Sequence, residues 1–340
     1  MLLTHETTIV LNKNDANIVG HMCYAAYKLW NVCNYERNNY KNLGLEKYPD
    51  WYYQKSKHKD DLWFKSLPSQ TAQEICKLLD KSWKSFYRLK ESGGIENPGT
   101  PRYKKDKMPI TYMQNGIQHE TGSFKVRLSL PKKLKEYMVH TYDIRAAYLY
   151  LKNPVFSNMD IIKQIKIYPP ANDGTSRLLV IYEVEDVLPE EDNGHYLSID
   201  LGLHNLMTCY DNAGKTFIIG REYLSLSYFY NKEIARVQSQ WGRIQAAREK
   251  EDLKTSKHLQ KLYRKKNDCI KDYIHKMTRY ITNYCVKNDI HTVVIGDIKG
   301  IRKERNLGRK TNQKLHGLPY ARIYMQLEYK LKMKGICLIR

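Results

Sequence analysis

The sequence has little that would place it in a membrane or hold it together by cross-links. No run approaches the ~20 consecutive apolar residues of a membrane-spanning helix, and the opening MLLTHETTIV lacks the basic stretch and apolar block of a secretion signal. The seven cysteines are odd in number and form no C-x-x-C pair, which argues against a disulfide framework and against a zinc site within the chain. These absences predict a soluble cytoplasmic protein with reduced, mostly buried thiols.

Acidic residues are scarce relative to basic ones. The chain has 57 Lys and Arg against 36 Asp and Glu, a formal net charge of +21 over 340 residues. Such a surplus opposes compaction through self-repulsion, so it is usually matched by a polyanion. We therefore expect nucleic acid as a partner, with binding that weakens steeply as salt is added. The 28 tyrosines are explained equally well by base stacking and by an A/T-rich coding sequence.

Hydrophobic spacing divides the chain into two parts, residues 1–190 and 195–340, joined by EEDNG at 190–194. In the first part, a strand at 7–11 precedes two helices that occupy the region 13–95. The first helix has apolar residues at spacings of three and four from Ile18 to Cys33 and is capped by Asn14 or Asp15, and Ser69 is the N-cap of the second helix. From 110 to 190 apolar and polar residues alternate, which is typical of short antiparallel strands. We predict a small β-barrel or sandwich into which the helices are inserted.

The second part shows a different order of elements. HYLSIDLG (195–202) and KTFIIG (215–220) resemble strands, and a long helical stretch runs from 226 to 288. The second half of this stretch keeps an apolar stripe from Ile270 to Cys285 on one face. HTVVIGD (291–297) is rich in β-branched residues, as is typical of a strand buried on both faces. A last helix begins near Pro319. This order, in which a strand ending in an acid is followed by a strand, a helix and a second strand ending in an acid, is that of a ribonuclease-H-like α/β domain. Together with the first part, it predicts an α+β multi-domain protein.

Asp200 ends the first of these strands, directly after the apolar Ile199. A carboxylate on a buried strand is costly unless a cation or hydrogen-bond donors hold it. In ribonuclease-H-like sites, carboxylates from separate elements hold two divalent ions ~3.5–4 Å apart. We therefore predict Asp200 as a ligand of Mg²⁺ or Mn²⁺, since hard cations prefer oxygen. Two alternatives stay open: a structural aspartate at a turn, and the phosphate-facing turn of actin-like ATPases, although their later D-x-G-G-G loops are missing.

Five segments together resemble the TnpB (OrfB) proteins of insertion sequences, which are RNA-guided DNA nucleases related to type V CRISPR effectors. They are PGTPRYKKDK, SIDLGLHNLMT, DYIHKMTRYI, TVVIGDIKGIRK and NQKLHGLPYARIYMQLEYKLKMKG, in the family's order. The resemblance implies a wedge β-barrel with a helical recognition insertion, followed by a RuvC-type nuclease domain. It also implies a guide RNA and a double-stranded DNA target as partners, with metal-dependent hydrolysis of DNA phosphodiester bonds.

The chain departs from this family at the second catalytic acid. The family's strand ends in Val-Ile-Glu-Asp-Leu, whereas here Gly296 takes the glutamate's place and Asp297 follows. Neighbouring strand residues point to opposite faces, so Asp297 serves as a catalytic metal ligand only if a bulge at Gly296 re-aims it. Alternatively Glu328, at the edge of the last helix's apolar stripe, takes over that role. Glu328 also has a plain structural interpretation, an i,i+4 ion pair with Lys332.

The family's zinc ribbon and third catalytic aspartate do not appear before Arg340. One acid cannot position two metal ions. We therefore expect either a truncated or decayed copy of an RNA-guided nuclease, or a silent relative that binds its target without cutting.

Basic segments that match the family are expected to contact nucleic acid. The alternatives are a solvated charged loop for residues 299–314, in which Glu304 is the one acid, and a structural role for His275. The predicted contact residues are Arg102, Lys104, Lys105, Lys276, Lys299, Arg302, Lys303, Arg305, Arg309, Lys310 and Lys314.

Overall fold

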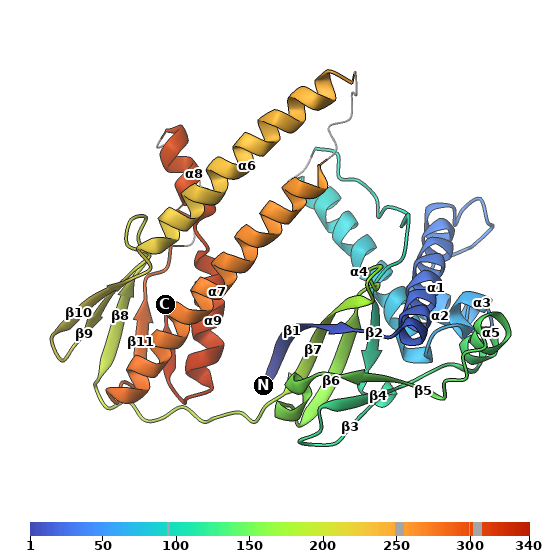
Figure 1. Ribbon diagram of the computed structural model, residues 1–340, viewed down its shortest axis with the longest axis horizontal. Coiled ribbons are helices and arrows are strands. Elements are labelled where there is room, and N and C mark those ends of the chain that lie inside the picture. Colours follow the sequence, from blue (N-terminus) through green and yellow to red (C-terminus); the bar gives the residue numbers. More distant parts are fainter. Residues whose placement is uncertain (94–95, 249–254, 299, 302–307) are drawn as a thin grey trace. The chain divides into compact units, whose positions relative to one another are not determined.

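The structure, a computed structural model, describes residues 1–93, 96–248, 255–298, 300–301 and 308–340 (Figure 1). The chain forms two compact units, Met1–Glu185 and Asp186–Arg340. Each unit combines helices with sheet, so the predicted α+β multi-domain class is confirmed. None of the described helices has both the length and the apolar character to cross a membrane. All seven cysteines are free thiols, and most of them are buried.

Two antiparallel sheets make up the strand part of the first unit. The larger sheet has the order β1-β7-β6-β2 and the smaller one β3-β4-β5. Each sheet keeps two edge strands, so the prediction of a closed barrel is wrong. The larger sheet cannot close because its end strands β1 and β2 each pair with a single neighbour. The strands are β1 (Leu2–Val10), β2 (Ile110–Met113), β3 (Ile117–His119), β4 (Lys125–Ser129), β5 (Tyr148–Lys152), β6 (Ile161–Ile167) and β7 (Thr175–Glu183).

Helices fill the chain between β1 and β2. Both predicted helices are present as α1 and α4, and the α1 positions expected to face the core, from Ile18 to Cys33, are buried. The N-cap of α1 is Asn12, whose side chain accepts a 2.8 Å hydrogen bond from the Asp15 N–H, so the predicted caps are wrong. The elements of this group, with α5 between β4 and β5 and two short 3-10 turns, are α1 (Lys13–Asn38), α2 (Trp51–Lys57), α3 (Leu62–Lys65), α4 (Ser69–Ser92), η1 (Gln114–Gly116), α5 (Lys132–Tyr142) and η2 (Pro154–Asn158).

A five-stranded sheet organises the second unit. Its order is β10-β9-β8-β11-β12, antiparallel from β10 to β8 and parallel from β8 to β12. Both predicted strands around residues 200 and 218 are present, but the strand between them, β9, was not predicted. The strands are β8 (Tyr196–Asp200), β9 (Met207–Asp211), β10 (Lys215–Ile219), β11 (Thr292–Ile295) and β12 (Cys337–Ile339).

Helices α7 and α9 pack against each other and against this sheet (Figure 1). The long helical stretch that the sequence predicts is in fact two helices, α6 and α7. The stripe expected on α7, from Ile270 to Cys285, is buried, and α9 adds Ile323 and Leu327 to the same core. The helices are α6 (Glu222–Ala246), α7 (Lys257–Lys287), α8 (Arg309–Gly317) and α9 (Tyr320–Lys332).

Candidate functional site

Two acids stand at one edge of the five-stranded sheet. β8 and β11 are parallel neighbours with Ile199 opposite Ile295, and the Gly296 N–H donates to the Ile199 carbonyl at 3.1 Å. Asp200 is the last residue of β8, and Asp297 is the second residue after β11. Because the two strands run in the same direction, both acids emerge at the same end. We call this end the carboxyl edge.

Asp200 is exposed, so the expectation of a buried aspartate is wrong. In β8 the side chains of Leu197 and Ile199 are buried in the core, and the two-residue period turns Asp200 to the opposite face. Among the described residues, its carboxyl group has no hydrogen-bond or ion-pair partner. The carboxylate therefore needs no cation to offset burial, but it is accessible to one.

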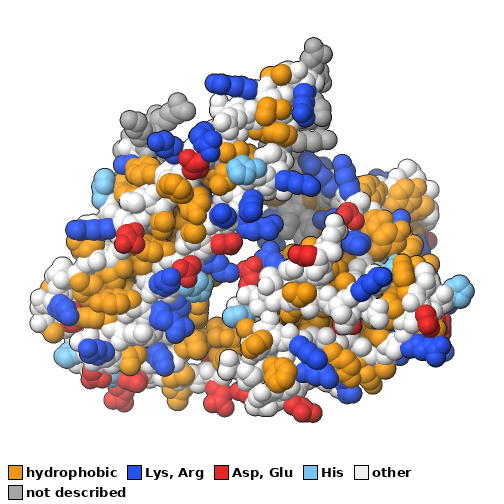
Figure 2. Space-filling view, in the orientation of Figure 1, with side chains coloured by type: hydrophobic (Ala, Val, Ile, Leu, Met, Phe, Trp, Pro, Cys, Tyr) orange, Lys and Arg blue, Asp and Glu red, His pale blue; other side chains and the backbone are white. Residues whose placement is uncertain are grey.

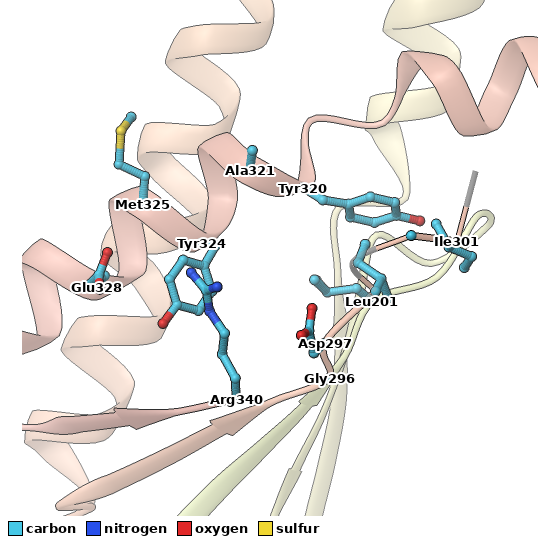
Figure 3. A pocket seen from close by; sticks show the side chains of 12 residues that line it. Leu201, Gly296, Asp297, Ile301, Tyr320, Ala321, Tyr324, Met325, Glu328 and Arg340 are labelled. Carbon is cyan, nitrogen blue, oxygen red and sulfur yellow. The ribbon is translucent and has the colours of Figure 1, made fainter. Parts of the chain in front are cut away.

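Asp297 reaches this edge because its strand ends before it, not because of a bulge. The β8–β11 register runs without a shift from Thr292 to Ile295. β11 stops there, so the alternation of a strand no longer fixes the direction of the Asp297 side chain. Figure 3 shows its carboxyl group directed into a pocket, and the residue is exposed.

The pocket at the carboxyl edge has a volume of about 610 Å³ (Figure 3). Asp297 and Glu328 both line it, so the structure brings together the two candidates for the second acid. Asp200 is not among its lining residues, although the next residue, Leu201, is. The remaining lining residues are Gly296, Ile298, Gly300, Ile301, Tyr320, Ala321, Tyr324, Met325 and Arg340.

Glu328 is exposed on α9 and does not form the expected pair with Lys332. The Lys332 ammonium instead lies 3.2 Å from the Asp186 carboxylate. Within the part of the chain that the structure describes, Glu328 has no ion pair. The basic member of the pocket lining, Arg340, stacks its guanidinium on the Tyr324 ring at 3.4 Å from the ring centroid. The pocket therefore combines two carboxylates with one guanidinium held on an aromatic face.

These three acids do not form a ready metal site. Carboxylate oxygens are the donors that Mg²⁺ prefers, so the chemistry of Asp200, Asp297 and Glu328 suits the ion. Their spacing does not. Among the described residues, Glu190, Asp289 and His291 are the one group of three metal-binding side chains whose ligand atoms all lie within 4.8 Å of one another.

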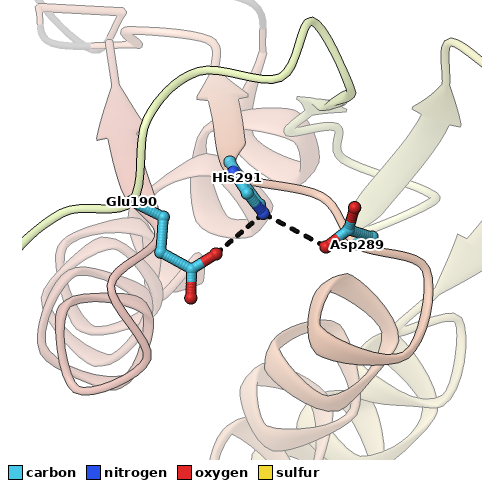
Figure 4. A group of neighbouring side chains, drawn as sticks. All are labelled: Glu190, Asp289 and His291. Atoms are coloured by element: carbon cyan, nitrogen blue, oxygen red, sulfur yellow. Dashed lines mark hydrogen bonds and ion pairs between the residues drawn. The ribbon is translucent and has the colours of Figure 1, made fainter.

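That group lies at the opposite end of β11, which we call the amino edge (Figure 4). His291 Nε2 is 2.8 Å from a Glu190 oxygen and 3.2 Å from an Asp289 oxygen, and its Nδ1 donates to the Glu191 carbonyl at 2.6 Å. The hydrogen bond to Glu191, followed by the two carboxylates, raises the pKa of His291. This cluster was not predicted from the sequence. Two segments far apart in the chain are the signals for it: the acidic segment at 190–194 and the Asp-Ile-His run at 289–291.

The basic loop before β2 is fixed along α1. The Trp30 indole donates to the Arg102 carbonyl at 3.2 Å. The Asn31 amide donates to the Lys104 carbonyl at 2.9 Å and accepts from the Lys104 N–H at 2.8 Å. The backbone is thus held while the side chains of Arg102, Lys104 and Lys105 stay exposed. Lys and Arg side chains are spread widely over the face shown in Figure 2.

Lys276 and His275 have local partners on or near α7. The Lys276 ammonium lies 2.7 Å from the Asp272 carboxylate one turn earlier, so its charge is already paired. His275 is half-buried, and burial, followed by the charge of Lys330, lowers the pKa of its imidazole. A neutral imidazole in this position fits the structural interpretation.

Most of the basic loop after β11 lies outside the residues that the structure describes. Lys314 lies on α8, with its ammonium 5.7 Å from the centroid of the Tyr228 ring. Only the backbone of Arg309 and Lys310 is described. The residues that lie outside the described part of the chain are Lys299, Arg302, Lys303, Glu304 and Arg305.

Comparison with known proteins places this geometry in a class. Residues 179–302 match the sequence model of the family OrfB_IS605, described as a probable transposase. The resemblance to TnpB proteins is therefore confirmed for this segment, which contains the first four strands of the five-stranded sheet and both acids of the carboxyl edge. No curated protein matches the chain.

One solved structure shares its fold with nearly the whole chain. A Cas12f1–sgRNA–target DNA complex is 15% identical, with 96% of this chain and 72% of that chain covered and a TM-score of 0.58. At this identity the likeness shows the fold alone. A CRISPR–Cas12f ternary complex is 16% identical, with 95% of this chain and 70% of that chain covered. Its TM-score of 0.33 is too low to establish a shared fold.

Proposed function

We propose that the chain is an RNA-guided, divalent-metal-dependent DNA endonuclease of the TnpB type. In this proposal residues 186–340 form a RuvC-like nuclease domain, and residues 1–185 form the wedge with its helical recognition insertion. The observation that carries it is the parallel β8–β11 pair, which delivers Asp200 and Asp297 to one edge beside a pocket that also contains Glu328. The order of the five strands, with β8 between an antiparallel and a parallel neighbour, agrees with a ribonuclease-H-like domain.

The residues divide into two roles under this proposal. Asp200 and Asp297 would bind the metal, with Glu328 as the acid that compensates for Gly296. Their ligand atoms do not all lie within 4.8 Å of one another in this structure, so binding would have to draw the three carboxylates together. The fixed basic loop at 102–105 contacts phosphates of the guide RNA or the target DNA, because its side chains are exposed while its backbone is held. Mg²⁺ or Mn²⁺ is the expected ion, since the donors are carboxylates.

A catalytically silent RNA-guided DNA-binding protein is the second candidate, and Gly296 favours it. The β8–β11 register ends with Ile199 opposite Ile295, and if it continued by one residue Gly296 would lie opposite Asp200. The position beside Asp200 therefore carries no carboxylate. Guide-dependent binding would survive in such a protein while hydrolysis would not.

Cleavage of a target plasmid tests the nuclease proposal. The protein is purified with the RNA that accompanies it when expressed together with the DNA flanking its gene, and it is given a matching target and Mg²⁺. We expect cutting that falls by about 100-fold or more in Asp200→Ala and Asp297→Ala. Asp289→Ala is the matched control, an exposed acid at the amino edge that should leave cutting unchanged. Absence of cutting by the unmodified protein would contradict the proposal.

Gly296→Glu separates the two candidates. A Cβ at position 296 would meet nothing closer than the Ile199 carbonyl oxygen at 4.0 Å, so a side chain fits without strain. The new carboxylate would stand beside Asp200. We expect the substitution to increase Mg²⁺-dependent cutting. If the unmodified protein binds its target in a guide-dependent way without cutting, and Asp200→Ala binds equally well, the silent protein is the correct assignment.

A further inference from the structure

A second large pocket, of about 750 Å³, lies within the first unit. Its walls are α1, α3 with the following Ser66, and α5, together with Lys107 at the end of the basic loop. None of the residues predicted from the sequence lines it. Its lining is dominated by aromatic rings, small residues and basic groups, with Glu136 as the acid among them.

The floor of this pocket is one face of α1. Gly20 and His21 are three and four residues after Asn17 and four and three residues before Tyr24, which places these residues on the same side of the helix. A core-facing stripe would carry large apolar side chains here. Gly20 instead carries no side chain, and the Lys107 ammonium lies over this position, at 3.5 Å from where a Cβ would stand.

Aromatic rings from three helices surround the floor. The His21 ring lies 5.0 Å from Tyr137 and 5.4 Å from Tyr142, centroid to centroid. His21 Nε2 is also 3.0 Å from the Tyr142 hydroxyl. Tyr24 lies 5.7 Å from Trp63 of α3. Tyr24, Tyr137 and Tyr142 remain exposed, so their faces are accessible to a planar ligand.

The charged groups at the rim are mostly basic. Lys107, Lys133 and His140 are exposed and line the pocket, whereas Glu136 is the opposing acid, 3.4 Å from Lys133. Burial, followed by the charge of Lys107, lowers the pKa of His21, so its imidazole is neutral near pH 7 and can accept or donate a hydrogen bond. Flat rings, hydrogen-bonding groups and cations at the rim are together complementary to a nucleotide.

The basic loop leads directly to this pocket. Its Arg102 and Lys104 are held beside Trp30 and Asn31 of α1, and five residues after Arg102 the same loop places Lys107 over Gly20. The ten helical residues between Gly20 and Trp30 span about 15 Å. A row of cations along that length can follow the phosphates of a strand rather than bind one small molecule.

We propose that this pocket holds one unpaired nucleotide of a bound nucleic-acid strand, with its base against the tyrosine rings and its phosphate at Lys107 and Lys133. The proposal rests on the nucleic-acid binding in the proposed function but not on cleavage. A base inside a duplex is stacked on both sides, so only an unpaired base presents its face to these rings.

The test compares single-stranded and duplex DNA of the same sequence, each labelled with fluorescein, by fluorescence anisotropy. We expect Tyr137→Ala to weaken binding of the single strand by about tenfold and to leave binding of the duplex unchanged. Tyr137→Phe keeps the ring and should retain the affinity. Tyr35→Ala removes an equally exposed tyrosine from α1 outside the pocket and serves as the matched control. Thermal unfolding of each variant shows that it is folded.

A second measurement uses a fluorescent base. Single strands that carry 2-aminopurine at one position should show a change in emission at a particular position, and the change should be absent in Tyr137→Ala. Lys107→Gln should reduce the dependence of log affinity on log salt by about one phosphate contact.

Four outcomes would overturn the proposal. If Tyr137→Ala binds the single strand as well as the unmodified protein does, with the same steep salt dependence, the pocket does not hold a nucleotide. The proposed function is not affected by that result. Displacement of the strand by free AMP at the strand's own affinity assigns the pocket to a small molecule instead. Equal losses on single strand and duplex show that the rings do not select an unpaired base. If the protein binds no nucleic acid at all, the proposed function falls together with the pocket.

Discussion

The two ends of the five-stranded sheet hold acids in opposite states. At the carboxyl edge, Asp200 and Asp297 are exposed. At the amino edge, Asp211 of β9 is buried, with its carboxylate accepting hydrogen bonds from the Tyr284 hydroxyl and from the Ala213 N–H, both at 2.8 Å. Glu190 and Asp289 at the same end are paired with His291.

The difference shows which carboxylates are used for hydrogen bonds within the fold and which are exposed to a ligand. A buried carboxylate is tolerated because fixed donors replace water, and Asp211 has those donors already. Asp200 and Asp211 both belong to the hairpin of β8 and β9, yet only Asp200 is free to interact with an ion or a phosphate-bound metal. A buried acid was predicted at Asp200, and this prediction is wrong; the buried acid of the hairpin is Asp211, which was not predicted.

Removing the buried acid should give the largest loss of stability. Asp211→Ala leaves the Tyr284 hydroxyl and the Ala213 N–H without their acceptor, so the free energy of unfolding should fall by about 1–3 kcal/mol. Asp200→Ala should change it by no more than about 0.5 kcal/mol, because an exposed acid without a partner is removed. Urea unfolding of the full chain measures both variants.

A double-mutant cycle sharpens this result. Tyr284→Phe removes the donor of the same hydrogen bond, so its effect and that of Asp211→Ala should not add. Burial, followed by Asp211, raises the pKa of Tyr284 to about 12, which agrees with a hydroxyl that keeps its proton for this bond. Equal losses from Asp200→Ala and Asp211→Ala would break the distinction between the two edges.

The sequence was sufficient to predict those parts of the fold that depend on local periodicity. The spacing of apolar residues in α1 and α7 and the β-branched run in β11 identified these elements. β9 was missed because Met207–Asp211 is only five residues long, although its Thr208 and Tyr210 are residues that favour strands. The burial of Asp200 was predicted wrongly for a different reason: alternation shows that two faces exist, but only tertiary packing decides which face meets the core.

The candidate site was predicted less completely than the fold. Asp297 and Glu328 were both named, but their meeting in one pocket depends on how α9 lies against the end of β11, which no local pattern contains. The His291 cluster and the α1 pocket were not found for a similar reason. Each is assembled from segments far apart in the chain, such as Gly20 with Lys107 and Tyr137.

Titration of His291 at the amino edge should change the stability of the fold by less than Asp211→Ala does. Its pKa is raised in the folded chain above the ordinary 6.5. A raised pKa means that the ion pairs contribute fully at pH values below 6.5 and that their contribution is lost as pH rises through the folded-state pKa. The melting temperature of the unmodified protein should therefore fall over this window relative to that of His291→Gln.

The control for this experiment is at the other edge. Asp297→Asn should keep the same pH dependence as the unmodified protein, since residue 297 follows β11 whereas His291 precedes it. Parallel curves for the unmodified protein and His291→Gln would contradict the assignment of the amino edge as an ionic cluster.

Helix α9 also has one charged group that is exposed and one that is used for hydrogen bonds. Glu328 faces the pocket. Lys330 donates to the His275 carbonyl at 2.9 Å and to the Thr278 hydroxyl at 2.6 Å, both on α7. Burial, followed by the charge of Arg279, lowers the pKa of Lys330 from 10.5 to about 8. Between these two values the unfolded chain binds a proton that the folded chain does not, so stability should rise with pH over this range.

Lys330→Met should remove that rise, and Lys332→Met, which changes an exposed lysine in the same helix, should retain it. The comparison isolates Lys330, because the tyrosines that also titrate at high pH are common to both variants. The rise should be smaller than the shift of the Lys330 pKa alone suggests, since Lys330 is only half-buried and water screens part of its charge. A rise that persists in Lys330→Met would show that the lysine is hydrated in solution, and that charged groups of α9 are as accessible on the α7 side as Glu328 is on the pocket side.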